Sequence, residues 1–353
     1  MEVSRKPKDR DFVRTNDDLL FCVVGYSHPP DRLLAYLKYV PSEKGLWASG
    51  SQHFQRMIPF YSSKVVSSTF SYLKEKYPQY LFYSPVNSIT FSAVPHSEIK
   101  EYYKPEQKLG EMIERGSELD KLQEKAIGLA EYLSAESGVP IDKIGVTGSI
   151  LLGIQNVSIS DIDLTIYGRH NSLLLKQALI QEHGKTGSAI RKLTKDQSNE
   201  WCRKKAKQFS IDYLSAKKIL SRKWNFGFYM QKAFSVHPTK LDAEITERYG
   251  EPQFIAGENV EIVARVEDNT QAIFNPSTYR VGEVQILKGP TVADLEEVVS
   301  FEGVFSDIAS PGERIKVKGK LELVTNTRIG GKYHRVVVGS DNVSLPEYLL
   351  PIH

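Results

Sequence analysis

Residues 145–168 read GVTGSILLGIQNVSISDIDLTIYG, and they contain the most informative pattern of the chain. Polar and apolar residues alternate over 161–167, which predicts a strand because successive side chains of a strand point to opposite faces. The apolar set then packs on a core, and Asp161 and Asp163 share the polar face with Cα atoms roughly 6–7 Å apart. Two like charges so placed repel unless a cation lies between them. The pair therefore predicts Mg²⁺ or Mn²⁺, bound by carboxylates together with substrate phosphates.

A Gly-Ser pair precedes the two carboxylates. Gly148 and Ser149 lie where a predicted strand, residues 144–147, gives way to a short predicted helix, residues 150–153. Backbone N–H groups at such a junction favour a phosphate, and glycine lets the backbone approach the anion closely. Taken alone, each half has a plain structural explanation, as a helix cap or as a solvated strand face. Their order and spacing together predict nucleotide binding at Gly148 and Ser149.

The combined pattern resembles the signature of the DNA polymerase β nucleotidyltransferase superfamily, which is h-G-[GS], a spacer and D-h-[DE]-h. The match covers 145–168 closely and 106–250 loosely. The layout of the whole chain is also similar to that of an uncharacterised archaeal predicted nucleotidyltransferase. The resemblance implies Mg²⁺-dependent transfer of a nucleotidyl group from an NTP to a hydroxyl acceptor, with release of pyrophosphate. It also implies that Asp161 and Asp163 are catalytic residues and metal ligands.

The resemblance further implies a third carboxylate on a later strand beside the first two. Residues 241–245 (LDAEI) alternate like a strand with Asp242 and Glu244 on its polar face. We favour Asp242 as the third catalytic residue and metal ligand, with Glu244 as the alternative, because Asp242 lies between apolar neighbours at the start of that strand. Asp212 fits less well, since its surroundings predict a helix. The long interval before Asp242 indicates a helical insertion and leaves a second hypothesis open. This is a non-catalytic nucleotide- or nucleic-acid-binding protein on a degenerate nucleotidyltransferase fold.

Positive charge is concentrated in residues 185–223. This segment holds twelve Lys and Arg against three Asp and Glu, whereas the whole chain has 46 against 43 and a net charge of +3. Aromatic residues are interleaved with the basic ones, a composition suited to triphosphate or to the backbone of RNA or DNA. The candidate nucleic-acid contacts are Arg203, Lys204, Lys205 and Lys207. The alternative is a solvated helix face whose aromatic residues pack inward, and the acceptor could equally be a small molecule or a protein.

The chain as a whole predicts an α/β protein of the α+β type in three parts. Residues 1–105 mix strand and helix patterns and contain no chemical motif that we recognise. Residues 106–250 would form the nucleotidyltransferase-like domain, with one helical pattern over 106–136 and another, mostly helical, over 200–230. Residues 251–353 show short alternating strands that predict an all-β domain, a β-barrel or a sandwich. That domain carries a weak repeat, because 257–262 matches 312–317 at an offset of 55 positions.

Composition excludes several other classes. The only cysteines, Cys22 and Cys202, cannot form a cysteine zinc site or a disulfide framework, and they fit a reducing compartment. The first residues are charged and unlike a signal peptide, and no apolar run is long enough to span a bilayer. We therefore expect a cytoplasmic protein without a membrane partner.

Overall fold

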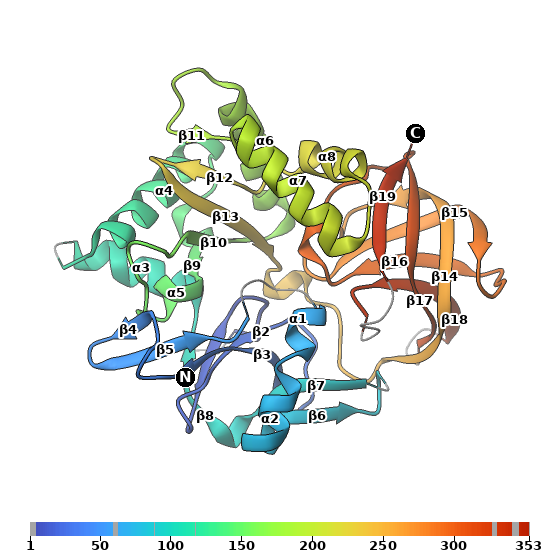
Figure 1. Cartoon of the computed structure of the whole chain (residues 1–353), viewed down its shortest axis with the longest axis horizontal. Helices are drawn as coiled ribbons and strands as arrows, with labels where there is room; N and C mark the ends of the chain where they lie inside the picture. The colour runs from blue at the N-terminus through green and yellow to red at the C-terminus, as the bar shows by residue number, and fades with distance from the viewer. Residues whose placement is uncertain are drawn as a thin grey trace.

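The computed structural model describes residues 5–58, 63–87, 89–116, 118–326, 330–340 and 346–352. It is a mixed α+β structure with three sheets that follow one another along the chain (Figure 1). In Figure 1 the first sheet lies at the bottom, the second at the upper left and the third at the right. The predicted mixed architecture is confirmed at this level, while the boundaries at 105 and 250 remain predictions. In the described ranges, every helix is too short or too polar to cross a lipid bilayer.

The first sheet has eight strands in the order β4-β5-β3-β2-β1-β8, with β7 paired to β3 and β6 paired to β7. Its strands are β1 (Phe12–Thr15), β2 (Leu20–Val23), β3 (Arg32–Pro41), β4 (Trp47–Ser49), β5 (Gln52–Arg56), β6 (Leu81–Ser84), β7 (Ile89–Pro95) and β8 (Ile99–Tyr103). Two short helices, α1 (Ser63–Ser67) and α2 (Phe70–Lys76), lie between β5 and β6 along the chain. Apolar residues of β2 and β3 form the centre of this sheet's core.

The second sheet has the order β11-β12-β13-β10-β9. Its strands are β9 (Ile144–Thr147), β10 (Ile162–Tyr167), β11 (Ile190–Arg191), β12 (Phe226–Tyr229) and β13 (Lys232–Thr239). Strand β10 is antiparallel to β9 and parallel to β13. Residues of three helices, α3 (Pro105–Arg115), α4 (Lys121–Ser137) and α6 (Arg169–Gly184), share one core with β9, β10 and β13. Between β9 and β10 lies α5 (Gly148–Leu151), a single turn.

The predicted helical pattern over 106–136 is two helices rather than one. Helix α3 ends at Gly116, whose φ of 58° is a conformation that glycine adopts readily. Helix α4 begins after Asp120, whose side chain accepts hydrogen bonds from the backbone N–H groups of Leu122 and Gln123. A C-terminal glycine and a new N-cap therefore separate two helices that share the same apolar spacing.

Helices α7 (Lys195–Phe209) and α8 (Tyr213–Arg222) contain most of the basic segment. They lie between the second and third sheets in Figure 1, and Phe209 and Ile219 belong to the core of the third sheet. The guanidinium of Arg222 also binds Glu313, with Nη2 2.8 Å from Oε1. The predicted helical content over 200–230 is correct as far as Arg222, but residues 226–229 form strand β12.

The third sheet is ring-like. Its strands are β14 (Pro252–Asp268), β15 (Ser277–Lys288), β16 (Leu295–Ser300), β17 (Arg314–Asn326), β18 (Gly331–Val338) and β19 (Tyr348–Ile352). The order β14-β15-β16-β18-β17 closes on itself because β14 also pairs with β17, and β19 adds to β17. The two repeat units pair directly, since Ile262 and Val317 are cross-strand neighbours. The short 3-10 helices of the chain are η1 (Pro78–Tyr80), η2 (His96–Glu98), η3 (Ile141–Lys143), η4 (Asp242–Glu244) and η5 (Gly303–Phe305).

Candidate functional site

Strand β10 holds the two carboxylates near one another. Ile162 and Leu164 are buried in the core of the second sheet, so Asp163 points to the opposite face. Asp161 directly precedes the strand and is exposed. The negative charge of Asp163, and to a smaller extent burial, raises the pKa of Asp161 to about 6. The two groups therefore interact electrostatically, as the alternation of the sequence predicts.

Asp163 is fixed by two side chains of the neighbouring strand β13. In the parallel register, Ser235 is the partner of Asp163 and His237 is the partner of Thr165. The hydroxyl of Ser235 donates a hydrogen bond to Oδ1 of Asp163, and Nε2 of His237 lies 2.8 Å from the same hydroxyl oxygen. Because serine has one proton to donate, the imidazole must be the donor to that oxygen. The three side chains form one hydrogen-bonded chain.

The electrostatics of this chain keep Asp163 charged. Burial alone would raise the pKa of Asp163, but the nearby His237, whose Nε2 lies 3.6 Å from Oδ1, the charge of Lys38 and the hydrogen bond from Ser235 outweigh it and lower the pKa. Burial, followed by the positive charge of Arg10, lowers the pKa of His237. At neutral pH the site thus combines an ionised carboxylate with a neutral imidazole.

Gly148 approaches Asp163 closely, as a site built on this motif requires. Its φ is +69°, and a Cβ at this position would lie 2.8 Å from Oδ2 of Asp163. Any other residue would therefore clash with the carboxylate or strain the backbone. Ser149 follows and is buried. Helix α5 has only four residues, so its dipole would add little, and an anion at this turn would be bound by local backbone N–H groups.

The first sheet supplies cations that sequence reasoning missed. Lys38 of β3 is only 8% exposed, and burial lowers its pKa although the negative charge of Asp163 acts in the opposite direction. Within the described ranges its ammonium forms no hydrogen bond or ion pair, and the nearby ring centroid of Phe12 is 5.4 Å away. Arg56 of β5 also acts on the site, since its charge opposes the rise in the pKa of Asp161. The available signal was a single lysine inside the apolar run RLLAYLKYVP.

The residues predicted to supply a third carboxylate are not brought to this pair. The strand expected at 241–245 is wrong, because Asp242 and Glu244 lie in the 3-10 helix η4 beyond the end of β13. Asp242 is ion-paired with Lys8, and Glu244 accepts hydrogen bonds from the backbone N–H groups of Leu241 and Arg169. Strand β13 ends opposite Tyr167, about 13 Å along β10 from Asp163. Asp212 caps α8 through the N–H of Ser215.

The four candidate nucleic-acid contacts differ in their surroundings on α7. Arg203 and Lys207 are exposed one helical turn apart. Lys204 is paired with Glu200 at 2.6 Å, and Lys205 donates to Oε1 of Gln208 at 2.8 Å. Of the four side chains, Arg203 and Lys207 therefore point to solvent, while Lys204 and Lys205 are held by neighbours on the same helix.

A cavity of about 250 Å³ adjoins Ser235 and His237. It is lined by groups from all three sheets or the segments beside them, including the cations Arg10, Lys205 and Lys223. Burial lowers the pKa of Lys223 to about 8. Asn225 and Asn275 also line it, and their buried Oδ1 atoms have no hydrogen-bond partner among the described residues. Such buried acceptors next to cations suit a ligand that offers both N–H donors and negative charge.

The donor set fits a divalent cation that arrives with a nucleotide. The described residues contain no group of three or more His, Cys, Asp or Glu arranged to hold a metal ion. Asp161 and Asp163 provide two carboxylates, and Mg²⁺ commonly takes one or two of these together with phosphate oxygens and water. The raised pKa of Asp161 shows that the pair resists carrying two negative charges without a cation.

Comparison with known proteins gives a full-length relative. The chain is 31% identical over 346 residues to the uncharacterized protein MJ1086 of Methanocaldococcus jannaschii, and the match covers 98% of each chain. No protein-family model matches the chain. No solved structure matches it either. The likeness to an uncharacterised archaeal protein is thus confirmed over almost the whole length, and the chain belongs to the same family as MJ1086.

Proposed function

We propose that this protein is a Mg²⁺-dependent nucleotidyltransferase that uses an NTP and a hydroxyl acceptor. The observation that carries the proposal is the pair Asp161 and Asp163, which interact closely enough to raise one pKa to about 6, with Gly148 against the second carboxylate. Carboxylates that resist joint ionisation, placed beside a glycine turn and the cations Lys38 and Arg56, suit a metal-bound triphosphate.

One set of residues would bind the phosphates of the nucleotide, and another would orient the carboxylate of Asp163. Lys38 and Arg56 approach from the first sheet and would bind phosphate oxygens, since the buried ammonium of Lys38 has no partner among the described residues. The backbone at Gly148 and Ser149 would bind the same phosphates from the other side. Ser235 and His237 would hold Asp163 in one orientation. A bound Mg²⁺ would neutralise phosphate charge and polarise the phosphorus that the acceptor attacks.

Acceptor activation needs a group that takes the proton of the attacking hydroxyl. The family resemblance implies a third carboxylate at this point, but the register places Ser235 beside Asp163 on the neighbouring strand. This observation favours a second candidate, a protein that binds nucleotide or nucleic acid without transferring it. The acceptor in the first candidate could be RNA, DNA, a protein or a small molecule.

Release of pyrophosphate from each of the four NTPs tests the first candidate. The protein should release it with Mg²⁺ and an acceptor, and Asp161→Asn plus Asp163→Asn should abolish release. Asp142→Asn, an exposed aspartate paired with Lys143, is the matched control and should behave like the wild type. Metal-dependent nucleotide binding without any pyrophosphate release would favour the second candidate, and absence of both would exclude this site from nucleotide chemistry.

A further inference from the structure

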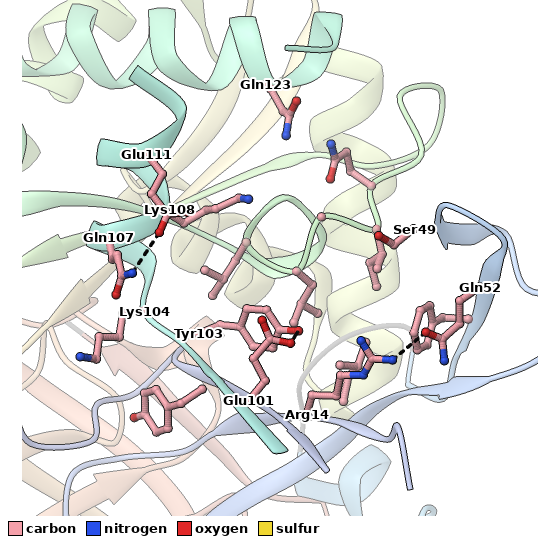
Figure 2. A pocket seen from close by; sticks show the side chains of 18 of the residues that line it. Arg14, Ser49, Gln52, Glu101, Tyr103, Lys104, Gln107, Lys108, Glu111 and Gln123 are labelled. Atoms are coloured by element: carbon pink, nitrogen blue, oxygen red, sulfur yellow. Dashed lines mark hydrogen bonds between the residues drawn. The ribbon is translucent and has the colours of Figure 1, made fainter. Parts of the chain in front are cut away.

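A second and larger cavity lies between α3 and the first sheet, with a volume of about 710 Å³ (Figure 2). Figure 2 shows Lys104, Gln107, Lys108 and Glu111 along one side, and Arg14, Ser49 and Gln52 on the other. The volume lies within the range of small-molecule and cofactor sites, roughly 300–1,000 Å³. The polar lining is unlike that of an apolar packing defect.

The described cations that line this cavity are Arg14, Lys104, Lys108 and Arg115, and Arg14 donates hydrogen bonds to Asp18 and Gln52. Lys104, Lys108 and Arg115 line it, and in the part of the chain that the structure describes no hydrogen bond or ion pair engages their charged groups. Both lining carboxylates already accept hydrogen bonds, Glu111 from Gln107 at 2.9 Å and Glu101 from the hydroxyl of Tyr103 at 2.5 Å. The cavity therefore has an excess of positive charge without partners, which favours an anion.

The spacing of these cations indicates an extended anion. Lys104 precedes the first residue of α3, and Lys108 and Arg115 follow at positions four and eleven further on, which places them along one face of the helix. At 1.5 Å per residue the row is about 16 Å long. A single phosphate or carboxylate would meet only one of the three charges, whereas a ligand with several phosphates could meet all of them.

The cavity is next to the carboxylate site. Strand β5 places Gln52, Phe54 and Arg56 on one face; the first two line the cavity, and the charge of Arg56 acts on Asp161. Gln52 and Arg56 are about 13 Å apart along the strand. Leu151 at the end of α5 also lines the cavity, while Gly148 at its start touches Asp163. One strand and one helical turn therefore separate the two sites.

We propose that this cavity binds an extended polyanion with several phosphate groups. The buried Oε1 of Gln155, which lacks a hydrogen-bond partner among the described residues, would accept a hydrogen bond from the same ligand. Two sources share this chemistry, a short single-stranded nucleic acid and a chain of inorganic polyphosphate. Hexauridylate serves as the probe for the first source and tripolyphosphate as the probe for the second. The binding measurement needs neither Mg²⁺ nor an NTP, so its outcome is independent of the nucleotidyl transfer proposed above.

The test compares the full chain with two variants that each lose three positive charges. The cavity variant is Lys104→Gln, Lys108→Gln and Arg115→Gln. The control is Lys74→Gln, Lys288→Gln and Lys332→Gln, three exposed lysines outside both cavities. Binding of labelled hexauridylate and of tripolyphosphate is measured between 50 and 200 mM salt, and thermal melting checks that each variant folds. Should the cavity triple variant fail to fold, Lys108→Gln plus Arg115→Gln replaces it.

At low salt, the cavity variant should bind roughly 100-fold more weakly to whichever probe the wild type binds. For hexauridylate, the log–log salt slope should also fall by about 2, since each of three phosphate contacts contributes about 0.7. The control should bind as the wild type does. Binding of hexauridylate alone would identify a nucleic-acid strand as the source, and binding of tripolyphosphate alone would identify an inorganic polyphosphate chain. Equal weakening in both variants, or no binding of either probe to the wild type, would overturn the proposal.

Discussion

Ser235 is the cross-strand partner of Asp163 and donates a hydrogen bond to its Oδ1 atom. The neighbouring strand thus offers a hydroxyl, backed by an imidazole, at the place where the family resemblance implies a carboxylate. A hydroxyl stabilises the ionised form of Asp163 but adds no negative charge for a metal. Within the described residues, the candidate site therefore offers a metal two carboxylates, Asp161 and Asp163.

Mg²⁺ and NTP should raise the melting temperature together, because a ligand that binds only the folded state stabilises it by about 2.7 kcal/mol at a hundred times its Kd. Asp161→Asn plus Asp163→Asn should erase this joint shift in a thermal melt while the ligand-free variant still folds. Asp142→Asn should keep the full shift. A double variant that keeps it would place the metal and the nucleotide elsewhere.

Ser235→Ala should weaken Mg²⁺-dependent nucleotide binding about 10-fold, the lower end of the effect usual for residues that orient a metal ligand. The physical reason is that Asp163 loses its hydrogen-bond donor and becomes free to rotate. Ser235→Thr retains a hydroxyl and should restore most of the affinity. Calorimetric titration of the three proteins separates the effects. Equal affinity in Ser235→Ala would show that Asp163 does not depend on this contact.

Asp242→Asn should leave nucleotide binding and any transfer rate unchanged, because Asp242 is paired with Lys8 beyond the end of β13. Glu244→Gln should instead lower the melting temperature, since Glu244 accepts the backbone hydrogen bonds of Arg169 and Leu241. Steady-state rates and thermal melts of both variants check this. A large loss of rate with unchanged binding in Asp242→Asn would restore it as the third catalytic carboxylate.

Binding of a longer single-stranded RNA should depend on α7. Arg203→Gln plus Lys207→Gln should reduce the log–log salt slope by about 1.4, because each single-strand phosphate contact contributes about 0.7. Lys204→Gln should have a smaller effect, since this lysine is paired with Glu200. The loss should be similar for unrelated sequences, as phosphate contacts carry no base information. Unchanged slopes would assign the exposed charges of α7 to a solvated surface.

Acid should destabilise the second sheet region through Glu182. Hydrogen bonds from Ser188 and Tyr132 lower the pKa of this carboxylate to about 2 from its ordinary value of 4.5. A lowered folded-state pKa contributes stability that is present above pH 4.5 and is lost as the pH falls towards 2. The free energy of unfolding of the wild type, measured with urea, should therefore fall by about 1–2 kcal/mol between pH 4.5 and 2. This is the size expected for the loss of charge-assisted hydrogen bonds.

Glu182→Gln provides the comparison for that pH dependence. It cannot ionise, so its stability should change less between pH 4.5 and 2 than that of the wild type. Glu118→Gln, at an exposed residue, should retain the wild-type pH dependence. Parallel curves for the wild type and Glu182→Gln would mean that other carboxylates account for the acid sensitivity.

The part of the site that lies within one strand could be predicted from the sequence. The alternation over 161–167 placed Asp163 opposite the core, and the Gly-Ser pair located the turn where Gly148 meets that carboxylate. The strand predicted at 241–245 is wrong because five alternating residues are too few to separate a strand from a 3-10 turn. Only the parallel register of β10 and β13 reveals that Ser235 occupies the neighbouring place.

The cations of the first sheet could not be predicted for a different reason. Lys38 and Arg56 act on carboxylates more than one hundred positions away in the chain, through packing of one sheet against another. A local pattern carries no information about that packing. The isolated lysine in β3 indicates only that a charge is buried, and what it faces is set by the tertiary structure.

Ile262 and Val317 occupy equivalent places in the 55-residue repeat and also face each other across β14 and β17. Antiparallel strands that pair at equivalent residues are related by a half-turn about an axis through that pair. The same rotation would carry the hairpin β14–β15 towards β17–β18, which is the symmetry of a two-fold dimer. The third sheet therefore has the layout of two hairpins fused into one chain. Strand β16, which pairs in parallel with β18, marks where that symmetry ends.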